Sequence, residues 1–556
     1  MPPGSPRTWP ALPIEPRGWL PVVTSPTVTG PWTEQIRFAL GVLDPLPEGT
    51  TRSDHSGVRI VTLLDEDLPD EGYRLDIADD GITIAASTAG GALQAATTIR
   101  QLLPAEAWWA TAARRDDWHL PITSLDDAPA WEHRGLMLDV ARWFSPVPEV
   151  LRWIELAAMH RLNRLHLHLT DDQGWRIESA AYPALAEVAS WRPATWIGHG
   201  RYHETPDPAN IDGTPHGGYY TSADLREISR YAARHGITIV PEVDLPGHAS
   251  ALLAAVPQLG VPDCPPQQVA QLWGLLGRTI SPLPEAMAIV ATLLGEAADA
   301  IDSPYLHIGG DEADLTMWRQ SGPVAELAAR SGGFEGLRAE VNAELVRIVL
   351  GLGRRPIAWD DAFVAGGLPT ECIVMPWRST ALGQAAAAVG HDVIMAPVLP
   401  TYLDYGEMMS DDEPLAIGAP QTLADVARWT PPSARAGSPG RVLGGQAQLW
   451  TEFLPDLAAR EYKVFPRLSV LAANLWRGEP LGEPGGDPFA SPDDAQAFTD
   501  VLARLDARHV NYRPITGPRP WQRGGSGRRA ARGVIPMAQM AAYLEVAAQH
   551  AEPPSM

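Results

Sequence analysis

The sequence predicts an α/β protein in which a (β/α)8 TIM barrel follows a small α+β domain. Three observations predict this architecture. Eight short apolar runs recur after residue 128, amphipathic stretches separate several of them, and 556 residues exceed what one barrel needs. We expect the small domain over residues 1–127, the barrel over 128–515, and an Arg/Gly-rich linker with a C-terminal helix over 516–556.

Strand-like runs and one helical pattern predict the small domain. The runs are VRIVTLL from Val58, YRLDIAD from Tyr73 and ITIAAS from Ile82. Asp80-Gly81 supplies a turn, and a helical pattern covers residues 89–103. A Pro- and Asp-containing segment over 120–129 is predicted to link this domain to the barrel.

The barrel is predicted from the number of apolar runs, because a closed (β/α)8 barrel needs eight strands. The runs begin at Leu136, Leu165, Ile237, Tyr305, Arg355, Cys372, Asp392 and Val442. Helices are expected over 222–235, where Thr221 and Asp224 form a capping box, and over 284–301 and 334–352. A last helical stretch is expected over 536–550.

Composition limits the partners of this chain. The net charge of −24 argues against nucleic acid and anionic membranes, because phosphate neutralisation needs a basic surface. Lys463 is the one lysine of the sequence, and Cys264 and Cys372 lack the spacing of a disulfide framework or a zinc site. A neutral small molecule is the expected partner.

The N-terminus has no apolar segment of the kind a signal peptide needs, and no run is long enough to span a membrane. We therefore expect a cytoplasmic protein, or a secreted one if the leader is missing from the sequence. The oligomeric state is left open.

Carboxylates and indoles follow the predicted strands. Because the chemistry of a (β/α)8 barrel occurs at the C-terminal ends of its strands, these groups should share one site. They are Asp139, Arg142, Asp171, Asp172, Glu242, Asp244, His248, Asp311, Glu312, Trp359, Asp360, Asp361, Trp377, Tyr402, Asp404, Trp450 and Glu452. An acid, a second carboxylate and flat apolar faces are what cleavage of a glycosidic bond requires. The residues alone predict a retaining glycoside hydrolase, although an adjacent acidic pair such as Asp311-Glu312 more often includes a helix cap.

Longer motifs make the prediction specific. They are HRGLMLDVARWF (133–144), HRLNRLHLHLTDDQGWRIE (160–178), GGYYT (217–221), VPEVDLPGHA (240–249) and YLHIGGDEA (305–313). With TYLDY (401–405) and QLWTE (448–452), they resemble glycoside hydrolase family 20, the β-N-acetylhexosaminidases. Where that family commonly has Arg-His-Phe after the first strand, this chain has Arg142, Trp143 and Phe144.

This resemblance implies a substrate-assisted reaction in which the 2-acetamido carbonyl oxygen of the sugar is the nucleophile. Glu312 would protonate the glycosidic oxygen and later act as base on water, once an oxazolinium intermediate has formed. Asp311 would hold the acetamido N–H and Tyr402 its carbonyl. His248 and Asp171, chosen over Asp172, would form a relay behind the acid.

The resemblance also implies which residues bind the sugar. Trp359, Trp377 and Trp450 would wall the site, and Arg134, Asp404 and Glu452 would bind the hydroxyls. A site closed in this way predicts exo action on a terminal, non-reducing β-linked GlcNAc or GalNAc, with no cofactor and no metal.

Two alternatives compete with this interpretation. His166 and His168 alternate on one strand, as metal ligands would, so a metal-dependent amidohydrolase barrel is one alternative. That motif belongs on the first strand, however, and here it falls on the second, with no lysine near a strand end. The other alternative is a catalytically silent sugar-binding protein, against which the intact Asp311-Glu312 pair argues.

Overall fold

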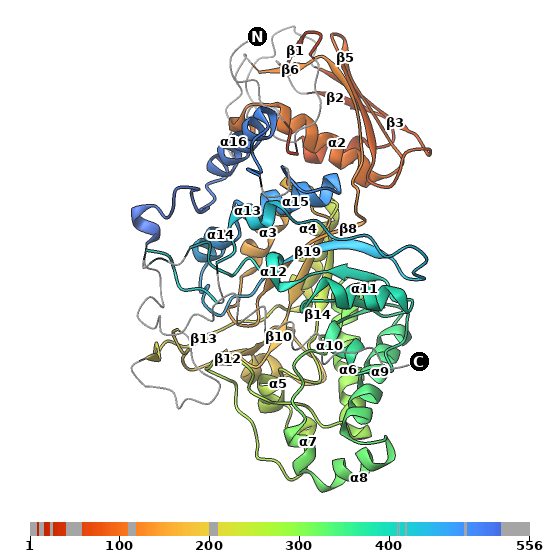
Figure 1. Cartoon of the computed structure of the whole chain (residues 1–556), viewed down its shortest axis with the longest axis vertical. Coiled ribbons are helices and arrows are strands. Elements are labelled where there is room, and N and C mark those ends of the chain that lie inside the picture. The colour runs from red at the N-terminus through yellow and green to blue at the C-terminus, as the bar shows by residue number, and fades with distance from the viewer. Residues whose placement is uncertain are drawn as a thin grey trace.

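The computed structural model describes residues 8–10, 16–22, 26–40, 58–108, 118–198, 210–408, 410, 412–417, 420–482 and 486–523. Most of the predicted linker and the whole helix expected over 536–550 lie outside these residues. Figure 1 shows the small N-terminal domain at one end of the molecule, with the barrel next to it.

The small domain is a five-stranded sheet with a helix packed on it. The strand order is β2 (Thr27–Thr29), β3 (Arg59–Leu64), β5 (Gly81–Ala86), β4 (Tyr73–Ala78) and β7 (Thr123–Asp127). Helix α2 (Ala89–Leu102) lies between this sheet and the barrel, and the Thr88 side chain caps its N-terminus by accepting from the Gly91 N–H. The three predicted runs and the predicted helix are thus confirmed.

The segment over 120–129 is more than a link, and that prediction was wrong. It contains β7, an edge strand that pairs antiparallel with β4. Thr123 and Leu125 are buried while Ser124 and Asp126 are exposed, so the strand has one face on the core and one in water. A further pair, β1 (Trp19–Pro21) with β6 (His119–Pro121), and helix α1 (Thr33–Ala39) complete this part.

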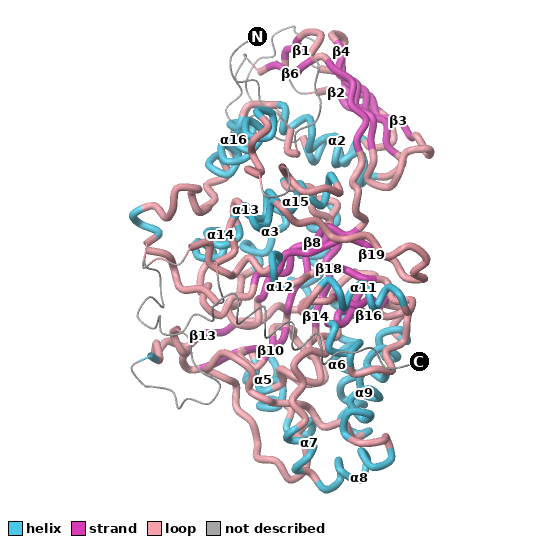
Figure 2. The backbone as a smooth tube through the Cα atoms, viewed as in Figure 1, coloured by secondary structure: helices cyan, strands magenta, loops and turns pink. Residues whose placement is uncertain are grey.

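The barrel is closed by eight parallel strands, as predicted. In order around the barrel they are β14 (Thr238–Glu242), β15 (Tyr305–His307), β16 (Arg355–Trp359), β17 (Ile373–Met375), β18 (Val393–Met395), β19 (Val442–Leu449), β8 (His133–Asp139) and β9 (Arg164–His168). Figure 2 shows these strands surrounded by helices and long loops. Short antiparallel pairs, β10 (Thr170–Asp171) with β11 (Gly174–Trp175) and β12 (Trp191–Arg192) with β13 (His216–Gly217), follow the second strand.

The barrel helices are α3 (Val147–Met159), α4 (Ser222–Arg234), α5 (Ser250–Ala255), α6 (Pro284–Ala300), α7 (Thr316–Gln320), α8 (Gly322–Arg330), α9 (Phe334–Gly351), α10 (Asp360–Val364), α11 (Thr380–Ala388), α12 (Val398–Thr401), α13 (Leu423–Ala427), α14 (Leu457–Val464), α15 (Arg467–Arg477) and α16 (Pro492–Ala507). Single 3-10 turns occur at η2 (Ala105–Trp108), η5 (Pro257–Leu259) and η6 (Pro520–Gln522), with a π turn at η3 (Leu185–Ala189). The predicted capping box of Thr221 and Asp224 begins α4. No helix among the described residues is long and apolar enough to cross a bilayer.

The two domains share buried side chains. Trp476, on helix α15 of the barrel part, lies in the core of the small domain and donates its indole N–H to Asp127 on β7 at 3.1 Å. Helix α16 also lies beside the small domain (Figure 1), where Phe498 packs against Trp9. The small domain is therefore packed firmly against one end of the barrel.

Candidate active site

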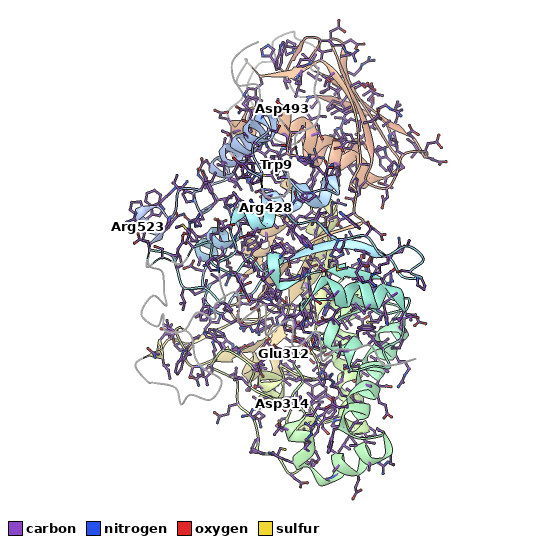
Figure 3. The ribbon with its side chains drawn as sticks, viewed as in Figure 1. Trp9, Glu312, Asp314, Arg428, Asp493 and Arg523 are labelled. Carbon is purple, nitrogen blue, oxygen red and sulfur yellow. The ribbon has the colours of Figure 1, made fainter. Side chains whose placement is uncertain are left out.

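The predicted site residues, with one exception, gather at the C-terminal ends of the barrel strands, which we call the mouth. The opposite end, where the strands begin and the small domain packs, is called the base. Figure 3 shows Glu312 in the half of the molecule away from the small domain. The mouth residues are Asp139, Arg142, Asp171, Asp244, His248, Asp311, Glu312, Trp359, Asp361, Trp377, Tyr402, Asp404, Trp450 and Glu452.

The Asp311-Glu312 pair lies on a tight loop after β15. Gly309 has φ +67°, and a Cβ there would lie 1.7 Å from Asp244 Oδ1, so glycine is required. Glu312 itself has φ +48°, a left-handed conformation that costs free energy and is concentrated at functional sites. Asp361, after β16, accepts a 3.5 Å hydrogen bond from the Glu312 backbone N–H. Neighbouring strand ends thus hold the loop in place.

The residues of the predicted relay lie next to one another. His248 Nδ1 lies 3.3 Å from Asp171 Oδ1, and its Nε2 lies 3.6 Å from Glu312 Oε2 and 3.8 Å from Asp311 Oδ2. Burial would lower the pKa of His248, but the charges of Asp171 and Asp244 outweigh it and raise the pKa well above its usual value. The imidazolium therefore faces both members of the acidic pair.

Burial raises the pKa of the Asp311 carboxyl well above its usual value, and the charge of Asp244 adds to the shift. The pKa of Asp244 is itself raised to about 7, first by burial. Burial and the neighbouring acids both favour the neutral form of Asp311. A positive charge that develops on a molecule bound beside Asp311 would favour its ionised form and be stabilised by it.

Indoles and one phenol line the same region. Trp359 is 1% exposed and donates its indole N–H to Glu242 at 2.8 Å, while Trp377 donates to Asp361 Oδ2 at 2.9 Å. The rings of Trp450 and Tyr402 lie next to each other, with centroids 6.1 Å apart, and the Tyr402 hydroxyl can donate or accept a hydrogen bond. The arrangement offers flat apolar faces and one hydroxyl.

Carboxylate oxygens without partners mark the other side of the mouth. Both oxygens of Asp404 and Oε2 of Glu452 are buried and accept no hydrogen bond from any residue that the structure describes. Burial raises the pKa of Asp404 well above its usual value, and the Glu452 charge adds to the shift. Unpaired buried acceptors are rare in folded proteins and are satisfied when ligand hydroxyls donate to them.

Arg134 is the exception, and its assignment to sugar binding was wrong. It lies at the beginning of β8, hence at the base, and its side chain is fully buried. Its guanidinium donates to Glu71 Oε1 of the small domain at 2.7 Å, to the Arg161 carbonyl at 2.9 Å and to the Trp131 carbonyl at 2.8 Å. Arg134 therefore joins the two domains and cannot reach the mouth.

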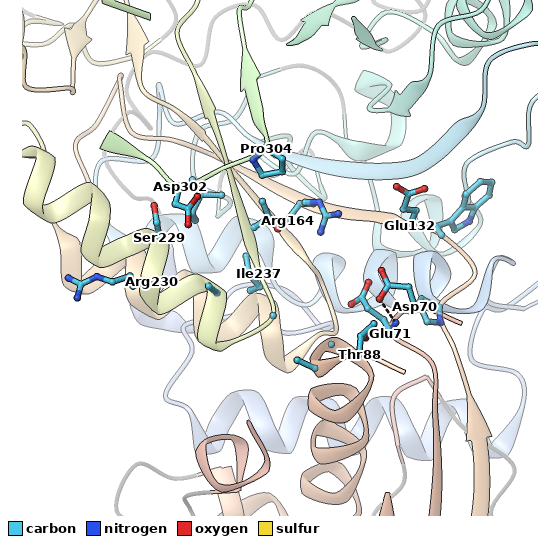
Figure 4. Close-up of a pocket in the computed structure, with 18 of the residues that line it drawn as sticks. Asp70, Glu71, Thr88, Glu132, Arg164, Ser229, Arg230, Ile237, Asp302 and Pro304 are labelled. Atoms are coloured by element: carbon cyan, nitrogen blue, oxygen red, sulfur yellow. Dashed lines mark hydrogen bonds between the residues drawn. The ribbon is translucent and has the colours of Figure 1, made fainter. Parts of the chain in front are cut away.

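Figure 4 shows the surroundings of Glu71, the partner of Arg134. Glu71 lines a cavity of about 1090 Å³ between the small domain and the base, together with Arg164 and Asp302. None of the predicted site residues lines this cavity. It lies at the end of the barrel opposite to Glu312.

Arg142 occupies the position at the mouth that Arg134 does not. Its Nη2 lies 2.8 Å from Asp171 Oδ2, and its guanidinium lies over the Trp450 ring at 5.1 Å. Burial would lower the pKa of Arg142, but the charges of Asp171, Asp139 and Glu452 outweigh it and raise this pKa. Arg142 was expected to follow the first strand but was not among the predicted site residues. The signal was available, because only the second arginine of HRGLMLDVARWF follows the strand.

His166 and His168, the possible metal ligands, lie inside the barrel. His166 Nδ1 accepts from the Gln446 amide at 3.0 Å, and His168 lies between Glu242 and Asp171 at 2.5 and 3.0 Å. Among the described residues four groups have ligand atoms close enough to hold an ion, and two of the four include these histidines: His166 with Glu242 and His307, and His168 with Asp171 and Asp244. Imidazoles alternate here with carboxylates that pair with them, so we interpret the arrangement as a hydrogen-bonded network.

Comparison with protein families gives two matches. Residues 131–479 match the catalytic domain of glycosyl hydrolase family 20, and residues 25–128 match domain 2 of the same family. A curated β-hexosaminidase of Porphyromonas gingivalis is 34% identical over 486 residues, which are 85% of this chain and 58% of the relative. One of Vibrio furnissii is 30% identical over 430 residues, covering 76% and 68%. The chain thus spans little more than half of the Porphyromonas relative.

Solved structures agree in fold. The GH20 exo β-N-acetylglucosaminidase of Vibrio harveyi, in complex with N-acetylglucosamine, superposes with a TM-score of 0.75 at 27% identity over 93% of this chain and 80% of that one. The GH20 β-N-acetylhexosaminidase of Streptomyces coelicolor A3(2) gives 0.73 at 29% identity over 90% and 95%. Both family models and both levels of similarity lead to one conclusion: this chain belongs to glycosyl hydrolase family 20.

Proposed function

We propose that this protein is a retaining, exo-acting β-N-acetylhexosaminidase that removes terminal β-linked GlcNAc or GalNAc by substrate-assisted catalysis. The relay Asp171–His248–Glu312, with Asp311 beside the same imidazole, is the observation that carries the proposal. The family and the β-hexosaminidase relatives support the same reaction class.

In the first step, Glu312 donates a proton to the glycosidic oxygen while the acetamido carbonyl oxygen of the sugar attacks C1. The C1–O bond breaks, the aglycone leaves as an alcohol, and an oxazolinium ion forms. Asp311 accepts a hydrogen bond from the acetamido N–H and balances the new positive charge. The Tyr402 O–H donates to the acetamido oxygen and keeps it in line.

In the second step, Glu312 takes a proton from water as the water attacks C1 from the face that the aglycone left. Two inversions at C1 give net retention, and the acetamido group is restored. The contact with Asp171 keeps His248 positively charged. This imidazolium offsets the negative charge that Glu312 carries between donating its proton and taking one from water.

Recognition of a terminal sugar follows from the acceptors at the mouth. The hydroxyls of the sugar donate to Asp404 and Glu452, whose oxygens have no partner among the described residues. Arg142, in place of Arg134, donates from the same side. Groups that enclose the hydroxyl end of the ring leave no room for a preceding sugar, which favours exo action.

Hydrolysis of an aryl β-N-acetylglucosaminide by the purified protein, with excess chelator present, tests the proposal. We expect turnover with chelator, loss of about 10²- to 10⁴-fold in Glu312→Gln, no turnover of the matching aryl β-glucoside, and a β-configured first product by NMR. Loss of activity with chelator would instead support a metal at His166 and His168. No turnover by the folded protein would leave the silent sugar-binding protein.

A further inference from the structure

The relay behind Glu312 does not end at Asp171. Asp171 Oδ2 lies 3.0 Å from His168 Nε2, and His168 Nδ1 lies 2.5 Å from Glu242 Oε2. The result is a line of alternating carboxylates and imidazoles, Glu242–His168–Asp171–His248–Glu312, that runs from the barrel interior to the acid. We call it the inner chain.

The same Glu242 carboxylate also holds a wall of the site. Its Oε1 accepts the Trp359 indole N–H at 2.8 Å, while its Oε2 accepts from His168. Glu242 and His168 are register partners on the adjacent strands β14 and β9, so the backbone fixes their separation. One carboxylate therefore orients both the indole wall and the imidazole that supports the relay.

Packing alone does not account for this arrangement. Glu242 and His168 are completely buried, and burying charged groups costs free energy that their mutual attraction rarely exceeds. The adjoining part of the barrel interior is filled with Val240, Ile357 and Ile373, so apolar side chains can fill this barrel. A buried ion pair at this position thus has a role beyond filling the interior.

We propose that Glu242 and His168 are positioning residues of the reaction, with His168 holding Asp171 behind the acid and Glu242 tying that line to the Trp359 wall. This inference rests on the proposed function. It assigns two roles to one buried network. His168 Nε2 supports proton donation by Glu312, and Glu242 Oε1 supports sugar binding by Trp359.

Two variants of His168 separate these roles, because each amide replaces one ring nitrogen. His168→Asn keeps a donor at the position of Nδ1 and the bond to Glu242, but it loses the bond to Asp171. His168→Gln keeps a donor at the position of Nε2 and the bond to Asp171, but it loses the 2.5 Å bond to Glu242 Oε2, beside which His166 Nε2 then remains, at 3.0 Å.

The readout is kinetics on two aryl β-N-acetylglucosaminides, a phenyl glycoside that needs protonation of its leaving group and a dinitrophenyl glycoside that does not. For His168→Asn we expect kcat to fall at least about tenfold on the phenyl substrate, clearly less on the dinitrophenyl substrate, with KM unchanged. For His168→Gln we expect KM to rise about threefold or more on both substrates, with little dependence on the leaving group.

His160→Asn is the matched control. His160 is also a buried imidazole with two hydrogen bonds, from Nδ1 to the Leu156 carbonyl at 2.7 Å and between Nε2 and Ser469 at 2.8 Å. Its Asn variant loses one bond in the same way, yet it lies outside the inner chain. We expect a lowered Tm with unchanged leaving-group dependence and KM.

Equal losses on both substrates in both His168 variants, matching those of His160→Asn, would overturn the inference and leave the proposed function intact. If wild type turns over neither substrate, the proposed function fails, and the inference fails with it. Should a His168 variant not fold, Trp359→Phe removes the indole N–H that Glu242 accepts, together with part of the aromatic wall. An unchanged KM in that variant would overturn the tie between the inner chain and the wall.

Discussion

The two ends of the barrel differ in whether their carboxylate oxygens have hydrogen-bond partners. At the base, both oxygens of Glu71 are satisfied, by Arg134 at 2.7 Å and by the Asn163 amide at 2.6 Å. At the mouth, Asp311 Oδ1 and both oxygens of Asp404 have no partner among the residues that the structure describes. The paired carboxylate at the base joins the two domains. The carboxylate oxygens without partners at the mouth can accept hydrogen bonds from a ligand.

The largest expected effect comes from the mouth. In the proposed reaction Asp311→Asn removes the charge that balances the oxazolinium ion, so kcat/KM should fall about 10²- to 10³-fold on an aryl β-N-acetylglucosaminide. Glu71→Gln makes the same kind of change at the base and should leave kcat/KM within about threefold. Steady-state kinetics on both variants check this, and equal losses would remove the distinction between the two ends.

The two arginines sharpen the comparison. Arg142→Met should lower kcat/KM about tenfold to a hundredfold, because it removes a donor to the sugar and the 2.8 Å ion pair with Asp171. Arg134→Met leaves the partly exposed Glu71 without its ion-pair partner, although Asn163 still donates to it, so the change should cost about 1 to 3 kcal/mol of unfolding free energy with kinetics close to wild type. Denaturant unfolding and kinetics measured side by side check this. A large kinetic loss with normal stability in Arg134→Met would restore its predicted role in sugar binding.

The pH dependence of stability should have opposite sign at the two ends. Burial alone would raise the pKa of Glu71, but the charge of Arg134 and the hydrogen bonds from Arg134 and Asn163 lower it below 4.5. Ionised Glu71 therefore stabilises the fold at neutral pH, and this contribution is lost as the pH falls through the lowered pKa. Burial raises the pKa of Asp404 above 3.8, so its stabilising contribution exists only in acid and is lost as the pH rises.

We accordingly expect Glu71→Gln to lower Tm at pH 7 and Asp404→Asn to raise it, by about 1 to 2 °C for each kcal/mol. Both differences from wild type should shrink as the pH approaches 4. Thermal melts of the three proteins between pH 7 and pH 4 measure this. A lower Tm for Asp404→Asn at pH 7 would contradict the assignment of Asp404 as an unpaired acid.

The smallest expected effect concerns the wall. Trp377→Phe keeps an apolar face but loses the 2.9 Å bond to Asp361, the residue that also accepts from the Glu312 backbone. We expect KM to rise about threefold with kcat nearly unchanged. If kcat fell while KM stayed constant, Asp361 would act on the acid loop rather than on sugar binding.

The sequence predicted the barrel well because the spacing of apolar residues and the number of apolar runs are enough to indicate it. Eight apolar runs became eight strands, and the capping box at Thr221 began a helix at the expected residue. The edge strand β7 was missed, because Thr-Ser-Leu-Asp-Asp resembles a polar link until its alternating burial against β4 is known. An edge strand with one wet face has a weak sequence signal.

The sequence predicted which side chains lie together at the mouth where this depends on their position after a strand, and it missed the contacts that depend on how neighbouring strands are aligned. Asp311, Glu312 and His248 follow strands and lie together at the mouth. Arg134 was assigned from a shared motif although it precedes its strand. The partnership of Glu242 with His168 depends on the register of β14 against β9, which no single sequence reveals.

The Trp476 indole bears on whether the barrel of this protein can be expressed without the small domain. It leaves helix α15 to enter the core of the small domain, and the guanidinium groups of Arg134 and Arg161 lie over its ring at 5.1 and 4.6 Å. A barrel expressed without the preceding residues would display this indole and two uncompensated cations to solvent. The small domain thus covers the base of the barrel permanently. Chimeras between relatives should therefore exchange the small domain and the barrel together.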